Sequence, residues 1–302
     1  MYARVAAAIT TALLGTAALL VPGSDAKAGS HATVSHARVG GIAGRPLVIG
    51  HRGASAQAPE NTLAAIDRAA ELGISWVEND VQRTRDGELV VIHDDSLQRT
   101  TNVKDVFPGR APWKVKDFTA AEIARLDAGS WFGSRFAGTR VPTLTQYMRR
   151  VEHNHQKLLL EIKNPELYPG MEQQILKVLG NEGWLDRQHL AGRLIVQSFG
   201  AHSLRIVHDL APTVRTALLG TPRVADLPAY AGFADGINPS HGSISRGYVA
   251  AVHSVAGPHG RPLGVFTWTV DDADTARQVA RYGVDGVISD KPDVVRTALR
   301  AP

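Results

Sequence analysis

Two acidic residues, Glu78 and Asp80, lie two positions apart in the candidate strand 76–81. Side chains two apart on a β-strand point to the same face, so both carboxylates would meet the same surroundings. In a poorly solvated interior the two negative charges would repel each other, and a bound cation would relieve that repulsion. The spacing is a weak signal on its own, because on an outward face both residues would simply be solvated.

A third carboxylate, Glu161, lies near the end of the next long apolar run, 157–162. Carboxylate oxygens suit hard cations, and the chain has no cysteine that could supply a thiolate ligand. We therefore predict that Glu78, Asp80 and Glu161 bind one divalent metal ion, Mg²⁺ or Ca²⁺ rather than Zn²⁺.

Two histidines follow apolar runs. His51 comes after 47–50, and His93 comes after 88–92. Imidazole titrates near neutral pH, so one histidine could accept a proton from an attacking oxygen while the other donates one to a leaving alkoxide. A lone histidine at a strand end is more often structural, so each of the two is a weak signal. Arg52, which follows His51, and Lys163, which follows Glu161-Ile162, could neutralise a phosphate.

Eight apolar runs that alternate with helical patterns would have to position these residues. The runs cover residues 47–50, 76–81, 157–162, 194–197, 214–219, 236–238, 264–269 and 286–289. Near-continuous apolar runs are typical of parallel strands buried on both faces. They predict an α/β fold, a TIM-type (β/α)8 barrel whose reactive groups lie at the carboxyl ends of the strands.

Two stretches depart from the alternation. The run 88–92 follows Asp86-Gly87, a hairpin signal, so we expect an antiparallel excursion folded over the barrel mouth. Residues 100–143 are interrupted by Gly and Pro and contain one short helical stretch, 120–126. We expect there an insertion of loops and a helix, without an independent core, as a cap beside the site.

Helix signals flank some of the expected strands. The stretch 61–72 has Asn61 as its expected cap and Gly73 as its stop. The stretch 272–282 repeats the pattern, with Asp271 or Asp272 as cap and Gly283 as stop.

The first residues are typical of a secretory signal peptide. A short start with Arg4 precedes an apolar run, 5–21, and small residues flank Lys27, so we expect cleavage after Ala28 and a secreted protein. The alternative, a membrane anchor, needs about 20 apolar residues, and this run is shorter. We expect a signal peptide at 1–28, a flexible leader at 29–45 and the barrel domain at 46–302.

The net charge of +4 is small and is spread along the chain without a block of Lys or Arg. This pattern argues against nucleic acid as a partner. No membrane span is expected after signal cleavage, and no partner protein is indicated.

The ordered set of motifs resembles the glycerophosphodiester phosphodiesterases from about Leu47 to near the C-terminus. The motifs are His51-Arg52-Gly53, Pro59-Glu60-Asn61-Thr62, Glu78-Asn79-Asp80-Val81, Asp86-Gly87 with Val90-Val91-Ile92-His93-Asp94, Arg99-Thr100-Thr101, Leu126-Asp127-Ala128-Gly129-Ser130-Trp131-Phe132, Val141-Pro142-Thr143-Leu144, Glu161-Ile162-Lys163, Gln197-Ser198-Phe199, Phe266-Thr267-Trp268-Thr269-Val270 and Asp285-Gly286-Val287-Ile288-Ser289-Asp290-Lys291-Pro292.

The resemblance implies a TIM-type barrel with a small insertion after the second strand. It implies that His51 and His93 are general acid and base, in either order, and that Glu78, Asp80 and Glu161 bind the metal. The candidate substrate-binding residues are Arg52, Lys163, Trp268, Glu60, Gln197 and Phe199. Of these, Glu60 matches an acidic position near the metal, although it could equally be a first-turn helix charge.

The implied reaction is metal-dependent hydrolysis of small-molecule glycerophosphodiesters to sn-glycerol 3-phosphate and an alcohol. A phospholipase D-like or C-like hydrolase of lysophospholipids is the first alternative, and aromatic residues of the insertion leave room for it. They are Phe107, Trp113, Phe118, Trp131 and Phe132. A secreted binding module without activity is the second alternative.

Two positions depart from the family pattern. Asn79 stands where the family usually has an apolar residue, and Gly200 stands where it often has an acidic one. Asn79 would point away from Glu78 and Asp80, so the metal site should be unaffected.

Overall fold

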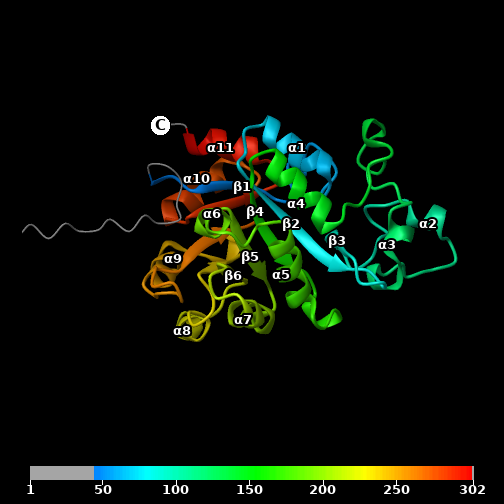
Figure 1. The fold of residues 1–302 in the computed structure, drawn as a ribbon. Coiled ribbons are helices and arrows are strands. Elements are labelled where there is room, and N and C mark those ends of the chain that lie inside the picture. Colours follow the sequence, from blue (N-terminus) through cyan, green and yellow to red (C-terminus); the bar gives the residue numbers. More distant parts are fainter. Residues whose placement is uncertain (1–43, 301–302) are drawn as a thin grey trace, which may run out of the picture. The chain divides into compact units, whose positions relative to one another are not determined.

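The computed structural model describes residues 44–300, so the predicted signal peptide and residues 29–43 of the predicted leader lie outside the described part. The strands of its barrel are β1 (Leu47–Gly50), β2 (Trp76–Arg83), β4 (Lys157–Ile162), β5 (Leu194–Ser198), β6 (Thr216–Leu219), β7 (Gly236–Asn238), β8 (Gly264–Thr267) and β9 (Gly286–Ser289). Neighbouring strands are parallel and follow chain order, and β1 pairs with both β2 and β9, so the sheet is closed. The predicted eight-stranded barrel is confirmed (Figure 1).

Helices connect the strands. The α-helices outside the insertion are α1 (Leu63–Glu71), α4 (Leu144–His153), α5 (Met171–Asn181), α6 (Arg187–Gly192), α7 (Ala201–Leu210), α8 (Leu227–Tyr230), α9 (Arg246–His253), α10 (Ala273–Tyr282) and α11 (Pro292–Arg300). Short 3-10 turns are η4 (Pro165–Leu167), η5 (Val224–Asp226) and η6 (His241–Ser243). None of the helices in the described range 44–300 is long and apolar enough to span a bilayer.

The start of α1 differs from the prediction, because Thr62 and not Asn61 caps the helix: the Thr62 side chain accepts from the backbone N–H of Ala65. Asn61 instead has a left-handed backbone (φ 59°), and its side chain turns into the barrel mouth toward Asp80. Both residue types can cap a helix, so local sequence could not distinguish them. For α10, Asp272 is the cap of the two predicted candidates, Asp271 and Asp272, and the predicted stop Gly283 is confirmed.

The hairpin after β2 is present as predicted. β3 (Leu89–Val91) pairs antiparallel with Val81–Arg83 at the end of β2, where the strand extends beyond the predicted run 76–81. The insertion continues from β3 with α2 (Val103–Val106), η2 (Val115–Asp117), α3 (Ala120–Ile123) and η3 (Ser134–Phe136). In Figure 1, α2 and α3 lie together beyond the end of β3.

The expectation that the insertion has no core of its own is wrong. Its apolar side chains form a cluster separate from those of the barrel, made of Val90, Ile92, Leu97, Val103, Val115, Phe118, Ile123, Leu126, Ala128 and Val141. These residues are scattered among Gly and Pro without helical or strand periodicity, so no local pattern predicts that they pack together.

The barrel interior has an apolar layer and a polar layer. The apolar layer contains Ile49, Trp76, Leu159, Ile195, Ala217, Phe266 and Ile288. One step further along the strands the inward positions become polar, and the register sets Asp80 beside Glu161 and Glu161 beside Gln197. Burial of these polar groups on apolar strands marks the carboxyl end of the barrel as the site.

Asn79 points away from this polar layer, as predicted. It is fully buried, and neither its amide nitrogen nor its amide oxygen has a hydrogen-bond partner. Its outward neighbours along β2, Val77 and Val81, belong to the apolar layer between barrel and helices. A buried amide without partners loses its hydration without compensation.

We expect Asn79→Leu, which keeps the branching of the side chain, to raise the free energy of unfolding by about 1–3 kcal/mol. Urea unfolding followed by circular dichroism measures this. Gln156→Leu is the matched control, because that buried amide donates to the Ile74 carbonyl at 3.0 Å. Loss of this hydrogen bond should lower the free energy of unfolding. Destabilisation by both substitutions would show that Asn79 is satisfied in solution.

Candidate active site

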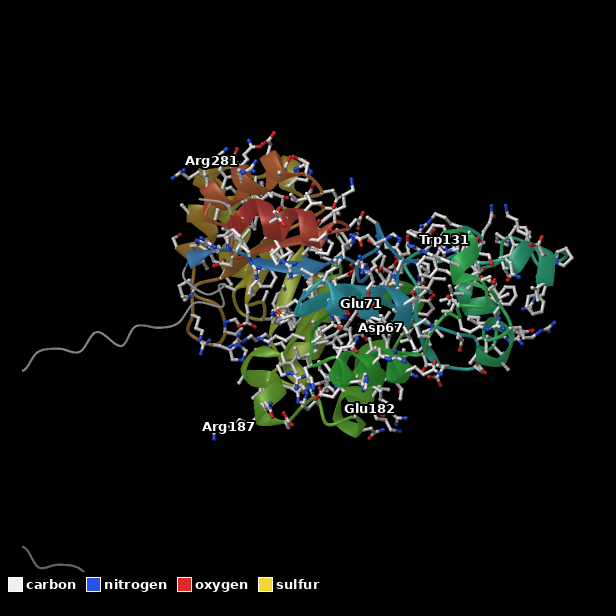
Figure 2. The ribbon with its side chains drawn as sticks, turned by 90° about the horizontal axis from the view of Figure 1, so that it is seen from above. Asp67, Glu71, Trp131, Glu182, Arg187 and Arg281 are labelled. Carbon is white, nitrogen blue, oxygen red and sulfur yellow. The ribbon has the colours of Figure 1, made fainter. Side chains whose placement is uncertain are left out.

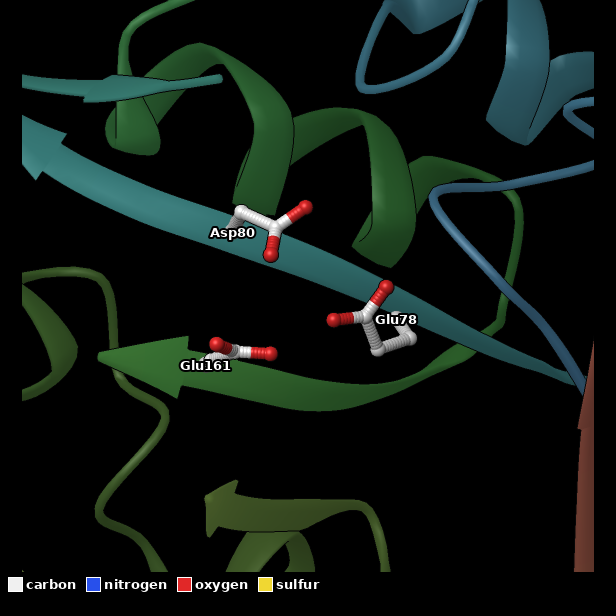
Figure 3. A group of neighbouring side chains, drawn as sticks. All are labelled: Glu78, Asp80 and Glu161. Atoms are coloured by element: carbon white, nitrogen blue, oxygen red, sulfur yellow. The ribbon is translucent and has the colours of Figure 1, made fainter. Parts of the chain in front are cut away.

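Three carboxylates converge at the carboxyl end of β2 and β4. Glu78 and Asp80 come from β2 and Glu161 comes from β4, with their oxygens turned toward one another (Figure 3). One oxygen from each lies within 4.8 Å of the others, and all three residues are at most 5% exposed. The period-two spacing thus brings Glu78 and Asp80 to one inward face, as expected.

The proton affinities of the three carboxyl groups differ. Burial, together with the charges of Asp80 and Glu161, raises the pKa of Glu78 well above its ordinary value. Burial and the charge of Asp80 raise the pKa of Glu161 to about 7. Burial opposes ionisation of Asp80 too, but Arg52 and Lys163 outweigh it and lower the pKa of Asp80 to about 2.

The cluster fits a divalent cation. Asp80 is buried, and its Oδ1 has no hydrogen-bond partner, although the Nζ of Lys163 lies 3.5 Å away. An unpartnered buried carboxylate oxygen facing two further carboxylates is a ready ligand for a hard cation. The donor set is oxygen alone, which suits Mg²⁺ or Ca²⁺ better than softer metals.

Cation binding to these residues should depend on pH. The pKa of Glu161 is raised from 4.5 to about 7, so its carboxyl group holds a proton more firmly in the folded protein than in the unfolded chain. Protonation of Glu161 therefore stabilises the cation-free fold fully below pH 4.5, and this stabilisation is lost as the pH rises through about 7. A cation must displace that proton. We therefore expect a saturating divalent cation to raise the melting temperature more at about pH 8 than at about pH 6.

Differential scanning fluorimetry at matched ionic strength tests this, with monovalent salt as the control. An equal shift at both pH values would mean that the cation does not bind at Glu161.

Two cationic side chains balance the carboxylates. The Nε of Arg52 lies 3.2 Å from Oδ2 of Asp80, and its backbone N–H donates to Oε2 of Glu78 at 2.9 Å. Lys163 donates from Nζ to Oε1 of Glu161 at 2.9 Å. Arg52 has a left-handed backbone (φ 55°), and Gly53 after it packs on α1 so tightly that a Cβ would lie 2.6 Å from the backbone of Ala65. The His51-Arg52-Gly53 motif is therefore a tight turn that aims Arg52 at the carboxylates.

His51 leaves β1 at the same end. Its Nδ1 lies 2.7 Å from Oδ1 of Asp290, which also accepts from the hydroxyl of Ser55 at 2.8 Å. Burial opposes ionisation of Asp290, yet its hydrogen bond with His51 lowers its pKa, so the carboxylate is charged at neutral pH. An ionised carboxylate only accepts, so Nδ1 of His51 carries the proton and Nε2 is left for proton transfer.

His93 reaches the site on the hairpin, as expected. The backbone N–H of Ile92 donates to the carbonyl of Asp80 at 2.9 Å, which brings the segment after β3 against the end of β2. The buried amide of Gln82 donates to the carbonyls of Ile92, His93 and Asp94 at 3.1, 2.9 and 2.6 Å. Gln82, two residues beyond Asp80 on β2, therefore fixes the backbone that carries His93.

The imidazole of His93 resembles that of His51 in its partner. Its Nδ1 lies 2.7 Å from Oδ1 of Asp94, which leaves Nε2 for proton transfer. Burial lowers the pKa of His93, and the charges of Arg52 and Lys163 act in the same direction, against Asp80 and Asp94. These surroundings favour the neutral imidazole of His93 over the protonated one.

The remaining candidate residues have different surroundings. Both oxygens of Glu60 are held by arginines, Oε1 by Arg52 and Arg99 and Oε2 by Arg99. Gln197 is buried and bonds to Glu78 at 3.4 Å and to Asn238 at 2.9 Å, so its amide orients a carboxylate.

Two aromatic candidates lie together at the mouth. Phe199 is 54% exposed and meets Trp268 edge to face at 5.8 Å, while Nζ of Lys163 lies 5.7 Å from the Phe199 ring. The Nε1–H of Trp268 donates to the carbonyl of Asn238 at 2.8 Å. At Gly200, where the family often has an acid, a Cβ would lie 2.8 Å from Cγ of Pro165, so a side chain there would require Pro165 to shift.

The aromatic residues of the insertion do not form one apolar lip. Phe118 is fully buried in the insertion's core, and Phe107 and Trp113 pack against that core. Trp131, labelled on the insertion in Figure 2, is 42% exposed and contacts Phe132 edge to face. The structure thus leaves a much smaller apolar surface than five aromatic residues suggested.

Several residues that contact the site residues had no predicted role in the site. Asp290 and Asp94 pair with the two histidines, Gln82 holds the His93 loop, and Asn61 donates to Asp80 at 2.8 Å. For Asp94 and Gln82 a signal existed, because one follows His93 directly and the other continues the inward-facing positions 78 and 80 of β2. For Asp290 the only signal in the sequence was its position directly after the last predicted strand, 286–289.

Comparison with known proteins agrees with this geometry. The profile of the glycerophosphoryl diester phosphodiesterase family matches residues 51–294. A glycerophosphodiester phosphodiesterase of Caldanaerobacter subterraneus is 36% identical over 264 residues, which cover 85% of this chain and 98% of that protein. A Bacillus subtilis enzyme of the same name is 34% identical over 264 residues, 83% of this chain and 85% of its own.

Solved structures agree as well. A phosphodiesterase of Oleispira antarctica, solved with its product sn-glycerol 3-phosphate, superposes with a TM-score of 0.73 at 29% identity, covering 85% of this chain and 98% of that one. A glycerophosphodiester phosphodiesterase of Agrobacterium tumefaciens gives 0.65 at 27% identity, with 83% and 99% covered. With the family profile, the two homologous enzymes and the closed barrel all in agreement, this chain belongs to the glycerophosphodiester phosphodiesterase family.

Proposed function

We propose that the chain hydrolyses glycerophosphodiesters to sn-glycerol 3-phosphate and an alcohol, with a divalent cation and two histidines. The observation that carries the proposal is the buried cluster of Glu78, Asp80 and Glu161 at the barrel mouth, within reach of two carboxylate-paired histidines. The Oleispira relative, whose structure holds sn-glycerol 3-phosphate as product, supports the same product here.

Glu78, Asp80 and Glu161 would hold the cation, for which Mg²⁺ and Ca²⁺ are both suited. A bound divalent cation polarises a phosphate oxygen and stabilises the negative charge that develops on it. Arg52 and Lys163, already beside the carboxylates, would neutralise the remaining phosphate charge. The Phe199–Trp268 pair offers an apolar wall at the mouth for the glycerol or alcohol part of the substrate.

The histidines would move protons at their Nε2 atoms. One takes the proton of the attacking oxygen, and the other gives a proton to the oxygen of the leaving alcohol. Their Nδ1 atoms stay bonded to Asp290 and Asp94, which stabilises each imidazole when it becomes cationic. The attacking oxygen is either water or a glycerol hydroxyl of the substrate, and a cyclic phosphate intermediate would identify the second route.

A coupled assay for glycerol 3-phosphate released from glycerophosphocholine tests the proposal. It is run on the wild type and on His51→Ala, each with and without EDTA. We expect activity only in the wild type with cation. Equal activity in all four conditions would disprove the mechanism, and release of choline phosphate would show that the other ester bond is cleaved.

An assay for choline and choline phosphate tests the phospholipase D-like or C-like alternative. It compares lysophosphatidylcholine with glycerophosphocholine, because either cleavage of the lysolipid leaves the acyl group on the glycerol and releases one of these two head-group products. Phe118 is buried, and Phe107 and Trp113 are partly buried against the same core, so these rings leave little apolar surface for an acyl chain. We therefore expect glycerophosphocholine to be the better substrate. A higher kcat/KM for the lysolipid would reverse this assignment.

We also propose that the protein is exported, on the strength of the N-terminal pattern. Expression in a secreting bacterial host, followed by N-terminal sequencing, tests this. Protein in the medium that begins at Gly29 is the expected result, and full-length protein retained in cells would contradict it.

A further inference from the structure

Arg99, in the insertion, makes four short contacts with two carboxylates. Its Nε and Nη2 donate to Asp94 at 2.7 and 3.1 Å, and its Nη1 and Nη2 donate to Glu60 at 2.7 and 2.8 Å. A planar guanidinium that holds a carboxylate through two bonds fixes the orientation of that group, which a single contact does not. Arg99 therefore sets the angle of both carboxylates.

The two carboxylates differ in how firmly they are otherwise held. Glu60 is 12% exposed and is already fixed from the barrel side by Nη1 of Arg52 at 2.8 Å. Asp94 is 31% exposed, and within the described residues its carboxylate bonds only to Arg99 and to Nδ1 of His93. Glu60 is thus an anchor, and Asp94 depends on Arg99 for its direction.

The backbone of this segment does not need Arg99. The amide of Gln82 holds the carbonyls of Ile92, His93 and Asp94 from inside. Removal of the Arg99 guanidinium would therefore leave the loop in place and release only the Asp94 side chain toward solvent. The His93 ring would then lose the group that sets its tautomer and its plane.

We propose that Arg99 is a positioning residue that orients His93 for proton transfer through Asp94, with Glu60 as its anchor on the barrel. This inference rests on the proposed function, because it assumes that His93 moves a proton. Arg99 itself touches no reacting atom and acts through Asp94.

A purely structural role for Arg99 would be to tie the insertion to the loop between β1 and α1, which carries Glu60. Arg135 provides the matched control, because its Nη2 donates to the carbonyl of Gln57 in the same loop at 2.9 Å. It links the same two segments but reaches neither histidine partner. The structural role predicts similar effects for Arg99→Ala and Arg135→Ala, whereas positioning predicts an effect on kcat for Arg99→Ala alone.

The test compares wild type, Arg99→Ala, Arg135→Ala, His93→Ala and the double variant Arg99→Ala/His93→Ala, as cation-loaded full-length protein on glycerophosphocholine. We expect Arg99→Ala to lower kcat about 10- to 100-fold and Arg135→Ala to change it less than about twofold, with similar melting temperatures. In the His93→Ala background, removal of Arg99 should cost less than about threefold, because the group that it orients is gone.

Two further measurements sharpen the result. Millimolar guanidinium should restore part of the kcat of Arg99→Ala, and Arg99→Lys should recover only part of it, because an ammonium cannot hold Asp94 and Glu60 through paired bonds. The inference would be overturned if Arg99→Ala kept the wild-type kcat. It would also be overturned if the loss of kcat in the double variant equalled the product of the two single-variant losses. If His93→Ala itself kept wild-type activity, the proposed function would fail instead.

Discussion

Asp80→Asn is expected to lower kcat/KM for glycerophosphocholine about 10²- to 10⁴-fold and to weaken binding of Mg²⁺ or Ca²⁺. Asp80 has the buried carboxylate oxygen without a hydrogen bond, and its pKa is the lowest of the three, about 2. It is therefore the carboxylate that stays charged when the cation is absent. Asparagine keeps its shape and removes that charge.

The measurement is steady-state kinetics together with calorimetric titration of the cation. Glu172→Gln is the control, because Glu172 is equally buried but bonds to Ser203 at 2.6 Å on the outer helices. It should leave kcat/KM within about twofold and cation affinity unchanged. Unchanged cation affinity in Asp80→Asn would remove the three-carboxylate site from the mechanism.

The second large effect is expected at the histidines. We expect His51→Ala and His93→Ala each to lower kcat about 10²- to 10⁴-fold, because each loses a proton-transfer group. Groups that act in one proton-transfer sequence are not additive, so the double variant should lose much less than the product of the two single losses.

His253→Ala is the matched control for both. His253 has the same exposed fraction as His51, 17%, and also pairs with a carboxylate, Asp285 at 2.8 Å. Asp285 precedes β9, so this pair lies at the amino ends of the strands, away from the carboxylates of the site. The coupled assay for glycerol 3-phosphate should show wild-type kcat for His253→Ala. A loss as large as that at His51 would point to a general effect on folding.

Much of the fold follows from local pattern. Continuous apolar runs and helix stops such as Gly283 predicted the barrel, and Asp86-Gly87 predicted the hairpin that carries His93. The inward direction of Glu78 and Asp80 followed from the two-residue period of a strand. These features depend on neighbours in sequence, so they can be read from the sequence.

Other features depend on groups brought together from far along the chain. Asp290 lies 239 positions from His51, and Arg99 meets Glu60 across 39 positions. The insertion's separate core and the choice of Thr62 over Asn61 as cap are of the same kind, since each was settled by which distant group lay within reach.

The sequence by itself therefore determined the barrel, the residue types of the site and the family. Only the tertiary structure decided which groups pair: which carboxylate holds each histidine, which oxygen of Asp80 is left unpartnered, and that Arg99 links His93 to the barrel. The physical reason is the distance along the chain over which each effect acts. Strand and helix periodicity act over a few residues, whereas hydrogen bonds and charges select partners by distance in space, which closure of the barrel sets.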